Sequence, residues 1–256
     1  MQGTISGFFT ALFIVITAIY PACGKSQEDA GSSNGKPGQV LEKKNPGDPF
    51  LSERESMVSF QIEQRGIHNR RVLDAMRIVP RHEFVPGGME NEAYYDSPVP
   101  IGYGQTISQP YIVALMTELL SPGRNSKVLE VGTGSGYQAA ILSLLAGEVY
   151  SVEIIKELHD TASATLKRTG YGKVRTASRD GYYGWPEHAP FDCIIVTCAS
   201  EFIPPPLIQQ LKNGGRMCIP VGPPFKVQHL VLVSKSTSGD ISVEMITQVR
   251  FVPLVH

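Results

Sequence analysis

The stretch VLEVGTGSGYQAA, residues 128–140, contains the pattern from which the fold of this chain can be predicted. Its first letters belong to a short apolar strand, Lys127–Val131, and its last letters begin a helix, Tyr137–Leu145. The turn between them is built on three glycines: Gly132, Gly134 and Gly136. Glycine lets the chain turn sharply and lets a ligand approach bare backbone at a helix N-terminus. The stretch therefore predicts a ligand site at the carboxyl end of the strand.

Strands and helices alternate on the C-terminal side of this turn. The pattern predicts strands at 148–153, 173–177, 191–197 and 216–221, and helices at 155–168 and 204–211. Two last strands, 229–234 and 241–252, follow with no helix between them, which predicts an antiparallel hairpin. Alternating strands and helices indicate a parallel sheet covered on both faces. We therefore predict an α/β protein with a doubly wound, mostly parallel seven-stranded sheet and an antiparallel C-terminal edge hairpin.

Helical patterns precede the glycine turn. Apolar residues recur at helical spacing over 53–79, up to Pro80, and again over 109–120. The second pattern stops at the breaker cluster Ser121-Pro122-Gly123. These segments predict an N-terminal helical cap on the sheet.

Acidic residues stand near the ends of the predicted strands. Glu153 lies about 20 residues beyond Gly132, where a carboxylate can accept both hydroxyls of a ribose. Asp180 ends the third strand and Asp192 opens the fourth, and we expect both to line the same crevice. The Asn213-Gly214-Gly215 run is expected to be a turn before the fifth strand.

The order of glycines and acids limits the choice of nucleotide. Dinucleotide binders carry G-x-G-x-x-G, whereas this chain has G-x-G-x-G preceded by Glu130, and no G-K-[ST] follows. An acid beside the turn disfavours a pyrophosphate and suits a ligand with a cationic amino-acid end. The pattern favours S-adenosylmethionine (AdoMet) and makes a nicotinamide cofactor the weakest alternative.

Blocks outside the turn make the chain resemble the protein-L-isoaspartate O-methyltransferase family, from about Ser52 to Leu254. The blocks are IGYGQTISQPYIVALMTELL (101–120), YSVE (150–153), Asp180-Gly181, FDCIIVT (191–197), LKNGGRMCIPVG (211–222) and VRFVPL (249–254). TISQP (106–110) is distinctive of that family, whereas the glycine turn is shared by AdoMet methyltransferases at large. The resemblance implies a Rossmann-like enzyme that methylates the free carboxylate of L-isoaspartyl residues in damaged proteins, which then return to aspartyl through a succinimide.

The resemblance also implies roles for single residues. Ser108 matches the active-site serine, and Thr106, Ile107 and Gln109 share its loop over cofactor and substrate. Glu130, Gly132, Gly134 and Gly136 match the turn that holds the methionine part of AdoMet, Glu153 the ribose ligand, and Asp180 with Gly181 the residues near the adenine. The VRFVPL strand, with Val252 and Leu254, matches the segment that holds the substrate peptide by its backbone. Two departures are Arg179, where the family usually has glycine, and the end of the chain at Val255-His256.

The chemistry of this reaction limits what the side chains must do. An isoaspartyl carboxylate, with a reference pKa of about 3.9, is already ionised at pH 7 and needs no general base. Ser108 would orient it by a hydrogen bond and would not act as a nucleophile. The alternative for Ser108 is a helix N-cap, because Pro110 follows within the first turn. Cys193 and Cys198 are expected to be buried on opposite faces, and Trp185 to pack beneath a loop.

Composition excludes several other classes of protein. A hydrophobic fraction of 42% with 18% charged residues predicts a substantial core, and a net charge of -1 gives no general attraction for nucleic acid. Four cysteines without a C-x-x-C pair, and histidines without H-E-x-x-H spacing, favour neither a disulfide scaffold nor a metal site. We expect a monomer that acts on isoaspartyl proteins and peptides, without a nucleic acid partner.

The N-terminal part differs in composition from the rest. Residues 1–24 hold no charged side chain and are largely apolar, typical of a signal or a membrane anchor, and 25–50 have the composition of a disordered linker before a methyltransferase domain at 51–256. Lysines after the apolar segment favour a cytoplasmic domain, which an uncleaved apolar segment would tether to the membrane. Export to the periplasm, a lipoprotein-like signal before Cys23 and a start at Met57 stay open. The functional alternatives are a methyltransferase for another carboxylate and a non-catalytic exported binding module.

Overall fold

A computed structural model describes residues 47–256. The predicted apolar segment, 1–24, and the predicted linker up to residue 46 lie outside the described residues. At the end of the predicted linker, residues 47–50 contact the folded part: the Asp48 carboxylate pairs with the Arg54 guanidinium at 2.6 Å, and the Phe50 ring packs against His82. From residue 47 to 256, no helix combines the length and the apolar character that a membrane span requires.

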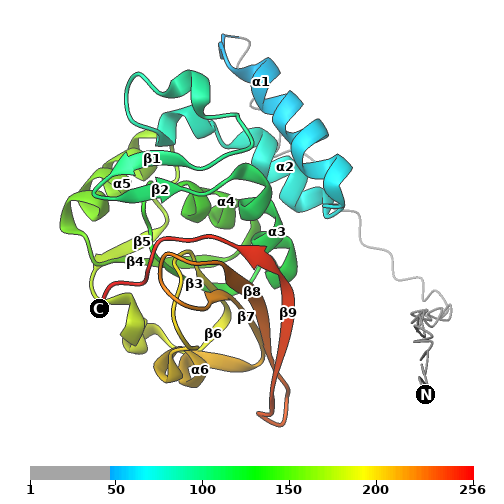
Figure 1. Ribbon diagram of the computed structural model, residues 1–256, viewed down its shortest axis with the longest axis vertical. Helices are drawn as coiled ribbons and strands as arrows, with labels where there is room; N and C mark the ends of the chain where they lie inside the picture. The colour runs from blue at the N-terminus through cyan, green and yellow to red at the C-terminus, as the bar shows by residue number, and fades with distance from the viewer. Residues whose placement is uncertain (1–46) are drawn as a thin grey trace, which may run out of the picture. The chain divides into compact units, whose positions relative to one another are not determined.

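A seven-stranded sheet forms the centre of the molecule, in the order β5-β4-β3-β6-β7-β8-β9 (Figure 1). The strands are β3 (Lys127–Val131), β4 (Glu148–Glu153), β5 (Arg175–Ser178), β6 (Phe191–Val196), β7 (Leu211–Val221), β8 (Gln228–Lys235) and β9 (Ile241–Val249). The strands from β3 to β7 pair in parallel, whereas β8 and β9 run antiparallel at one edge. The predicted doubly wound sheet and its edge hairpin are confirmed.

One predicted turn is part of a strand. Asn213-Gly214-Gly215 lies inside β7, which starts five residues before the predicted 216. A Cβ at Gly215 would lie 2.8 Å from the carbonyl oxygens of Asp192 and Lys212, so only glycine lets β7 approach β6 this closely. The register between these strands shifts at this point, and an irregularity in the pairing replaces the turn.

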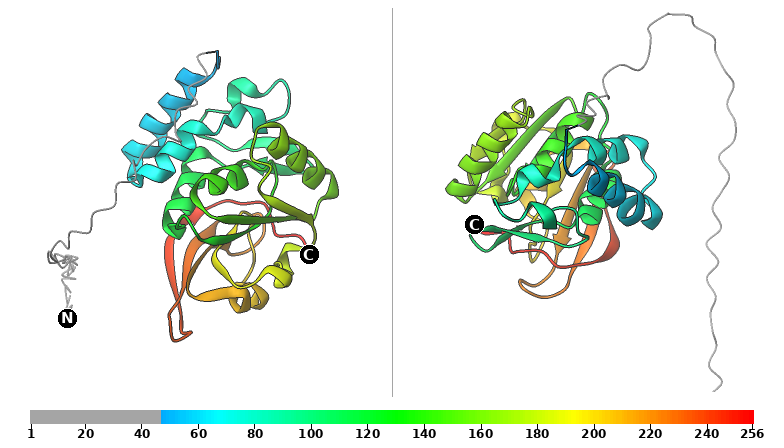
Figure 2. Two further views of the ribbon diagram at one scale, coloured as in Figure 1. Left: turned by 180° about the vertical axis from the view of Figure 1, so that it is seen from behind. Right: turned by 90° about the horizontal axis from the view of Figure 1, so that it is seen from above.

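Helices cover the sheet on both faces (Figure 2). They are α3 (Pro110–Leu120), α4 (Tyr137–Leu145), α5 (Lys156–Arg168) and α6 (Pro205–Gln210). Val128 of β3 packs in the same core as α3 and α4, and its neighbour Leu129 packs in the core beneath α6. Cys193 and Cys198 are buried in these opposite cores, as the alternation of a strand predicts.

The N-terminal cap is helical but interrupted. It contains α1 (Leu51–Ser56), a π-helical turn (Met57–Ile62), a 3-10 turn (Glu63–Arg65) and α2 (Arg70–Ile78). Gly66 has a left-handed φ of +97° and ends the first part, and the Asn69 side chain accepts from the Arg71 amide at 3.0 Å to start α2. The predicted helical cap is present, with an interruption at 66–69 inside the segment of helical spacing.

Short elements connect the cap to the sheet. They are η3 (Arg81–Phe84), η4 (Glu90–Glu92) and the hairpin of β1 (Val99–Gly102) and β2 (Gln105–Ile107), followed after β5 by η5 (Gly181–Tyr183) and η6 (Pro186–His188). The hairpin was missed by the sequence patterns because its strands are only four and three residues long. Its turn places Tyr103 and Gly104 at positive φ, and β2 leads directly into the Ser108 loop.

Candidate functional site

A cavity opens at the carboxyl ends of β3 and β6, where the strand order reverses direction. Of the predicted site residues, nine line it: Thr106, Ile107, Ser108, Gly132, Gly134, Glu153, Gly181, Val252 and Leu254. The structure does not bring Glu130, Gly136 or Asp180 to its surface. The cavity therefore joins the predicted cofactor turn, the TISQP loop and the C-terminal segment.

The glycine turn adopts a conformation that side chains disfavour. Gly132, Gly134 and Gly136 have φ of +93°, +52° and +89°. A Cβ at Gly132 would lie 2.5 Å from Thr197 Oγ1, which donates a hydrogen bond to the Gly132 carbonyl at 2.6 Å. A Cβ at Gly136 would instead meet Leu166 of α5 at 3.2 Å, so this glycine serves helix packing. Thr197 was missed, although its position after a central apolar strand is the signal that locates it.

Glu153 supplies the negative charge of the cavity. Its carboxylate accepts from the amides of Gly134 at 2.8 Å and Ile155 at 3.0 Å, which fixes it at the end of β4. Among the described residues that line the cavity there is no lysine, arginine or histidine. A phosphate-bearing nucleotide would find no cation there, whereas a cationic ligand with a ribose finds a carboxylate and bare glycine backbone. The lining thus fits AdoMet better than a dinucleotide.

Glu130 lies beneath the cavity floor. Its side chain is fully buried and accepts a short hydrogen bond from Ser151, whose oxygen lies 2.6 Å from Thr133 Oγ1 on the cavity wall. Burial raises the pKa of the Glu130 carboxyl to about 8, and its Oε1 has no hydrogen-bond partner among the described atoms. Contrary to expectation, Glu130 therefore does not reach the cavity directly but is linked to its wall through Ser151 and Thr133.

The residues after β5 divide between the cavity and its support. The Asp180 carboxylate accepts from the Tyr182 amide at 2.9 Å and caps η5, while Gly181 itself lines the cavity. Arg179 donates to Glu187 at 2.9 Å, and its guanidinium lies over the Trp185 ring, away from the lining residues.

Asp192 and Trp185 take structural positions. Asp192 lies at the amino end of β6, where it accepts from the Lys127 amide at 2.9 Å and from Lys212 at 2.7 Å. The prediction that Asp192 lines the crevice is wrong. The crevice lies at the carboxyl ends of the parallel strands, whereas Asp192 lies at the opposite, amino end of β6. Trp185 packs edge-on against Tyr150 at 5.5 Å, as expected for a side chain beneath a loop.

Ser108 stands between the cavity and an adjoining groove. Four residues line both: Thr106, Ser108, Thr197 and Val252. The groove continues along Gln109, Ile112, Val227 and residues 248–251. The N-cap of α3 is Gln109, and no side chain caps that helix, so the alternative of Ser108 as a helix cap is wrong.

The segment 249–254 forms one wall of both spaces. The predicted strand ends at Val249, three residues early, and the chain then crosses to the loop after β6, where Ala199 donates to Val252 and accepts from Leu254 at 2.8 and 2.7 Å. Gln228, which is fully buried, accepts from the Phe251 amide at 2.9 Å and donates to the Pro223 carbonyl at 3.1 Å. No sequence pattern points to Gln228, because its role depends on pairing across the edge hairpin.

These features define the class of protein. The chain has the Rossmann-like fold of AdoMet-dependent methyltransferases, with its cavity at the reversal of strand order. The family model described as protein-L-isoaspartate(D-aspartate) O-methyltransferase matches residues 52–256, and the chain belongs to this family.

Curated relatives agree with this assignment. Protein-L-isoaspartate O-methyltransferase 2 of Syntrophobacter fumaroxidans is 49% identical over 254 residues, 99% of this chain and 98% of that protein. Protein-L-isoaspartate O-methyltransferase of Opitutus terrae is 55% identical over 205 residues, 80% of this chain and 88% of that protein. A solved structure described as protein-L-isoaspartate O-methyltransferase is 29% identical with a TM-score of 0.72, and the match covers 79% of this chain and 66% of that one.

Proposed function

We propose that this protein transfers the methyl group of AdoMet to the free carboxylate of L-isoaspartyl residues in damaged proteins and peptides. The resulting ester allows return to aspartyl through a succinimide. Membership of the family supports this reaction, and a solved Plasmodium falciparum member, 24% identical, is described as a complex with S-adenosyl-L-homocysteine.

The observation that carries the proposal is the shared wall between cavity and groove. Ser108, Thr106, Thr197 and Val252 border both spaces, so a donor in the cavity and an acceptor in the groove would meet at these residues. Holding two reactants in one geometry can lower a barrier by about 7–11 kcal/mol, which suits a reaction that needs no acid or base. The groove runs along residues 248–252, at the end of the edge strand β9, where an extended peptide could lie beside the chain.

Each predicted site residue has a proposed role. Gly132 and Gly134 hold the methionine part of AdoMet, Glu153 accepts from the ribose hydroxyls, and Gly181 lies at the adenine. Glu130, Gly136 and Asp180 lie behind the lining. Glu130 supports Thr133, Gly136 allows the packing of α5, and Asp180 caps η5. Thr106, Ile107, Val252 and Leu254 position the peptide.

Ser108 orients the acceptor carboxylate. AdoMet supplies a methyl group made electrophilic by its sulfonium. The substrate carboxylate is ionised at pH 7, so the hydroxyl of Ser108 donates a hydrogen bond to one oxygen and leaves the other free to attack. Both reactants lose charge as the methyl group moves, and the apolar side chains of Ile107, Val252 and Leu254 favour that change by excluding water.

The test compares two peptides of one sequence, one with L-isoaspartate and one with normal aspartate. Transfer of labelled methyl to the isoaspartyl peptide alone is the expected result. Equal labelling of both peptides would contradict the substrate. Turnover of small carboxylic acids with no peptide labelling would favour a methyltransferase for another carboxylate. AdoMet binding without any turnover would favour a binding module.

The setting of the enzyme is proposed from its donor. AdoMet is made in the cytoplasm, so we propose that the domain works there, with residues 1–24 as a membrane tether. We propose as well that the protein is a monomer. Cell fractionation with N-terminal sequencing of the mature protein tests the location. Recovery of periplasmic material that begins at Cys23 would contradict it, and light scattering measures the oligomeric state.

A further inference from the structure

Arg81 is a fully buried arginine that lies outside the cavity lining. Its Nε donates to the Ala93 carbonyl at 2.6 Å, and its Nη2 donates to the Ser108 carbonyl at 2.7 Å. The guanidinium also lies over the ring of Tyr137, 4.8 Å from its centroid, at the first turn of α4. One side chain therefore connects the segment after η4, the Ser108 loop and the helix that follows the glycine turn.

The buried charge of Arg81 lowers the stability of the fold, so its presence indicates a role beyond packing. None of the carboxylates between residues 47 and 256 pairs with the guanidinium, and its Nη1 has no hydrogen-bond partner there. Burial lowers the pKa of Arg81 to about 10, so the group stays charged at pH 7. A buried charge without an ionic partner is costly, and an apolar side chain of similar size would be cheaper if packing were its only task.

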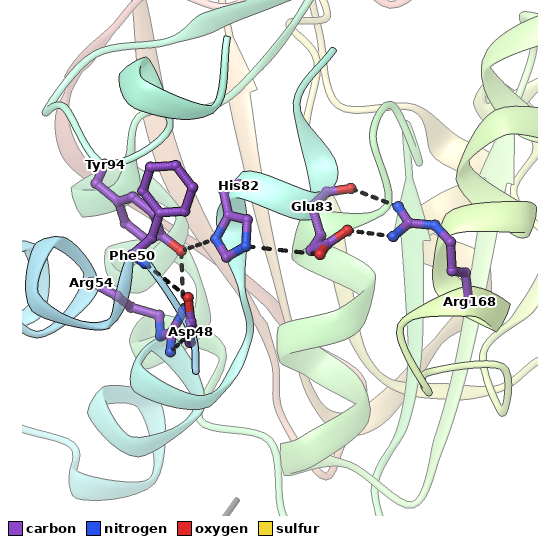
Figure 3. A network of polar contacts seen from close by, with 7 residues as sticks. All are labelled: Asp48, Phe50, Arg54, His82, Glu83, Tyr94 and Arg168. Atoms are coloured by element: carbon purple, nitrogen blue, oxygen red, sulfur yellow. Dashed lines mark hydrogen bonds and ion pairs between the residues drawn. The ribbon is translucent and has the colours of Figure 1, made fainter. Parts of the chain in front are cut away.

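The segment that carries Arg81 is held on both sides. Figure 3 shows His82 and Glu83, its neighbours in η3, with their partners: His82 Nδ1 and Tyr94 Oη are 2.7 Å apart, and Arg168 of α5 pairs with Glu83. Tyr94 in turn receives a hydrogen bond from Arg54 at 3.2 Å. The segment η3, from which the Arg81 guanidinium reaches Ser108, is thus held by Tyr94 on one side and by α5 on the other.

The Ser108 carbonyl has no place in a helix or a sheet. β2 ends at Ile107, α3 begins at Pro110, and the first turn of α3 uses the Gln109 carbonyl, which accepts from Val113. The orientation of the Ser108 peptide is therefore set by the bond from Arg81, since the neighbouring secondary structure does not use this carbonyl. Ser108 itself lines both the cavity and the groove.

We propose that Arg81 is a positioning residue that fixes Ser108 for methyl transfer by its hydrogen bond to the Ser108 carbonyl. This inference rests on the proposed function of Ser108. Arginine is required because its planar fork reaches two carbonyls at once, whereas a lysine ammonium at the same place is a single point charge.

The test is a double-mutant cycle of Arg81→Lys and Ser108→Ala, measured as kcat/KM for the isoaspartyl peptide. In the otherwise wild-type protein, Arg81→Lys is expected to lower kcat/KM roughly tenfold, because small misplacements of reacting groups are costly. In the Ser108→Ala background the same change is expected to have less than a twofold effect. The Kd for AdoMet is expected to stay within twofold in each variant, because Arg81 does not line the cavity.

Arg71→Lys is the matched control. Arg71 of α2 is also an arginine whose guanidinium donates to two backbone carbonyls, that of Pro122 at 2.8 Å and that of Leu145, and it has no bond to the Ser108 loop or to Tyr94. The variant is expected to lower the melting temperature as Arg81→Lys does, with kcat/KM unchanged within twofold. Equal losses of activity in Arg71→Lys and Arg81→Lys would overturn the inference, because they would trace the loss to a general loss of stability.

Failure of the inference is distinct from failure of the function. Equal effects of Arg81→Lys with and without Ser108 would overturn the positioning role while leaving the reaction intact. Wild-type protein that does not methylate the isoaspartyl peptide, or Ser108→Ala protein with full activity, would overturn the proposed function itself.

Discussion

The cavity and the adjoining groove share a wall but are built in different ways. The cavity floor comes from one continuous stretch, in which β3, the glycine turn, α4 and β4 follow each other over residues 127–153. The groove is assembled from segments that are far apart in sequence, at 106–112, Thr197, Val227 and 248–252. A local motif can therefore define the donor site, whereas the acceptor site depends on tertiary packing.

The two spaces also differ in charge and in support. Glu153 supplies the charge of the cavity, and the backbone amides of Gly134 and Ile155 hold it in place. The groove wall is held instead by long-range bonds from buried side chains, of which Gln228 to Phe251 is an example. Substitutions in the two spaces should therefore separate donor binding from acceptor handling.

The largest expected effect is that of Ser108→Ala, at the shared wall. Loss of the hydroxyl should lower kcat for the isoaspartyl peptide by roughly 10²-fold, as removal of a donor to reacting oxygens typically does. The Kd for AdoMet, measured by calorimetry, should change less than twofold. Ser108→Thr, which keeps a hydroxyl, is the control and should retain more activity than alanine. A tenfold weaker binding of AdoMet in Ser108→Ala would show that the wall serves the donor as well.

Glu153→Gln should have the reverse effect of Ser108→Ala, because it should weaken donor binding and leave acceptor handling unchanged. Hydrogen bonds to a charged group contribute about 1.5–3 kcal/mol, so the Kd for AdoMet should rise roughly 10- to 100-fold. At saturating AdoMet, kcat and the KM for peptide should stay close to wild type. Unchanged AdoMet affinity would contradict the proposed ribose contact.

The same contrast explains what the sequence predicted. The strands of the seven-stranded sheet, the helices α3 to α6, and Gly132, Gly134 and Glu153 at the cavity follow from short patterns of apolar residues and glycines. Arg81, Thr197 and Gln228 do not, because each acts on a backbone group that is brought near it by folding. Glu130 was placed beside the ligand because adjacency in sequence suggests adjacency in space, but a strand residue points to one face only, and that face is buried.

Gln228→Leu tests whether the groove wall works separately from the cavity. The change leaves the Phe251 amide without its partner and should loosen residues 250–252, since an unpaired buried donor costs about 1–3 kcal/mol. The KM for the isoaspartyl peptide should rise roughly tenfold, and more than the Kd for AdoMet. Equal rises in both constants would indicate that 249–254 is a single wall for both ligands.

Glu130→Gln tests the floor of the cavity through pH. The ordinary pKa of 4.5 rises to about 8 in the fold, so the folded protein favours the protonated carboxyl. The stability from this preference is complete below pH 4.5 and is lost as pH rises toward 8. Glutamine does not ionise, so the free energy of unfolding of the variant should rise relative to that of wild type between pH 5 and pH 9, by roughly 2–4 kcal/mol. Melting curves of the ligand-free proteins that stay parallel across this range would contradict the burial of Glu130.

The smallest expected effect is that of Arg179→Gly, which restores the residue usual in the family. Arg179 follows the end of β5, beside Asp180 and Gly181, so its position in sequence suggests a changed adenine pocket. Its side chain instead pairs with Glu187 and covers Trp185, and exposed ion pairs of this kind contribute little to stability. The Kd for AdoMet should therefore change less than twofold, with a small loss of melting temperature. A several-fold change in AdoMet affinity would mean that the donor site extends beyond the residues that line the cavity, and that the separation between donor and acceptor regions is less sharp than their walls indicate.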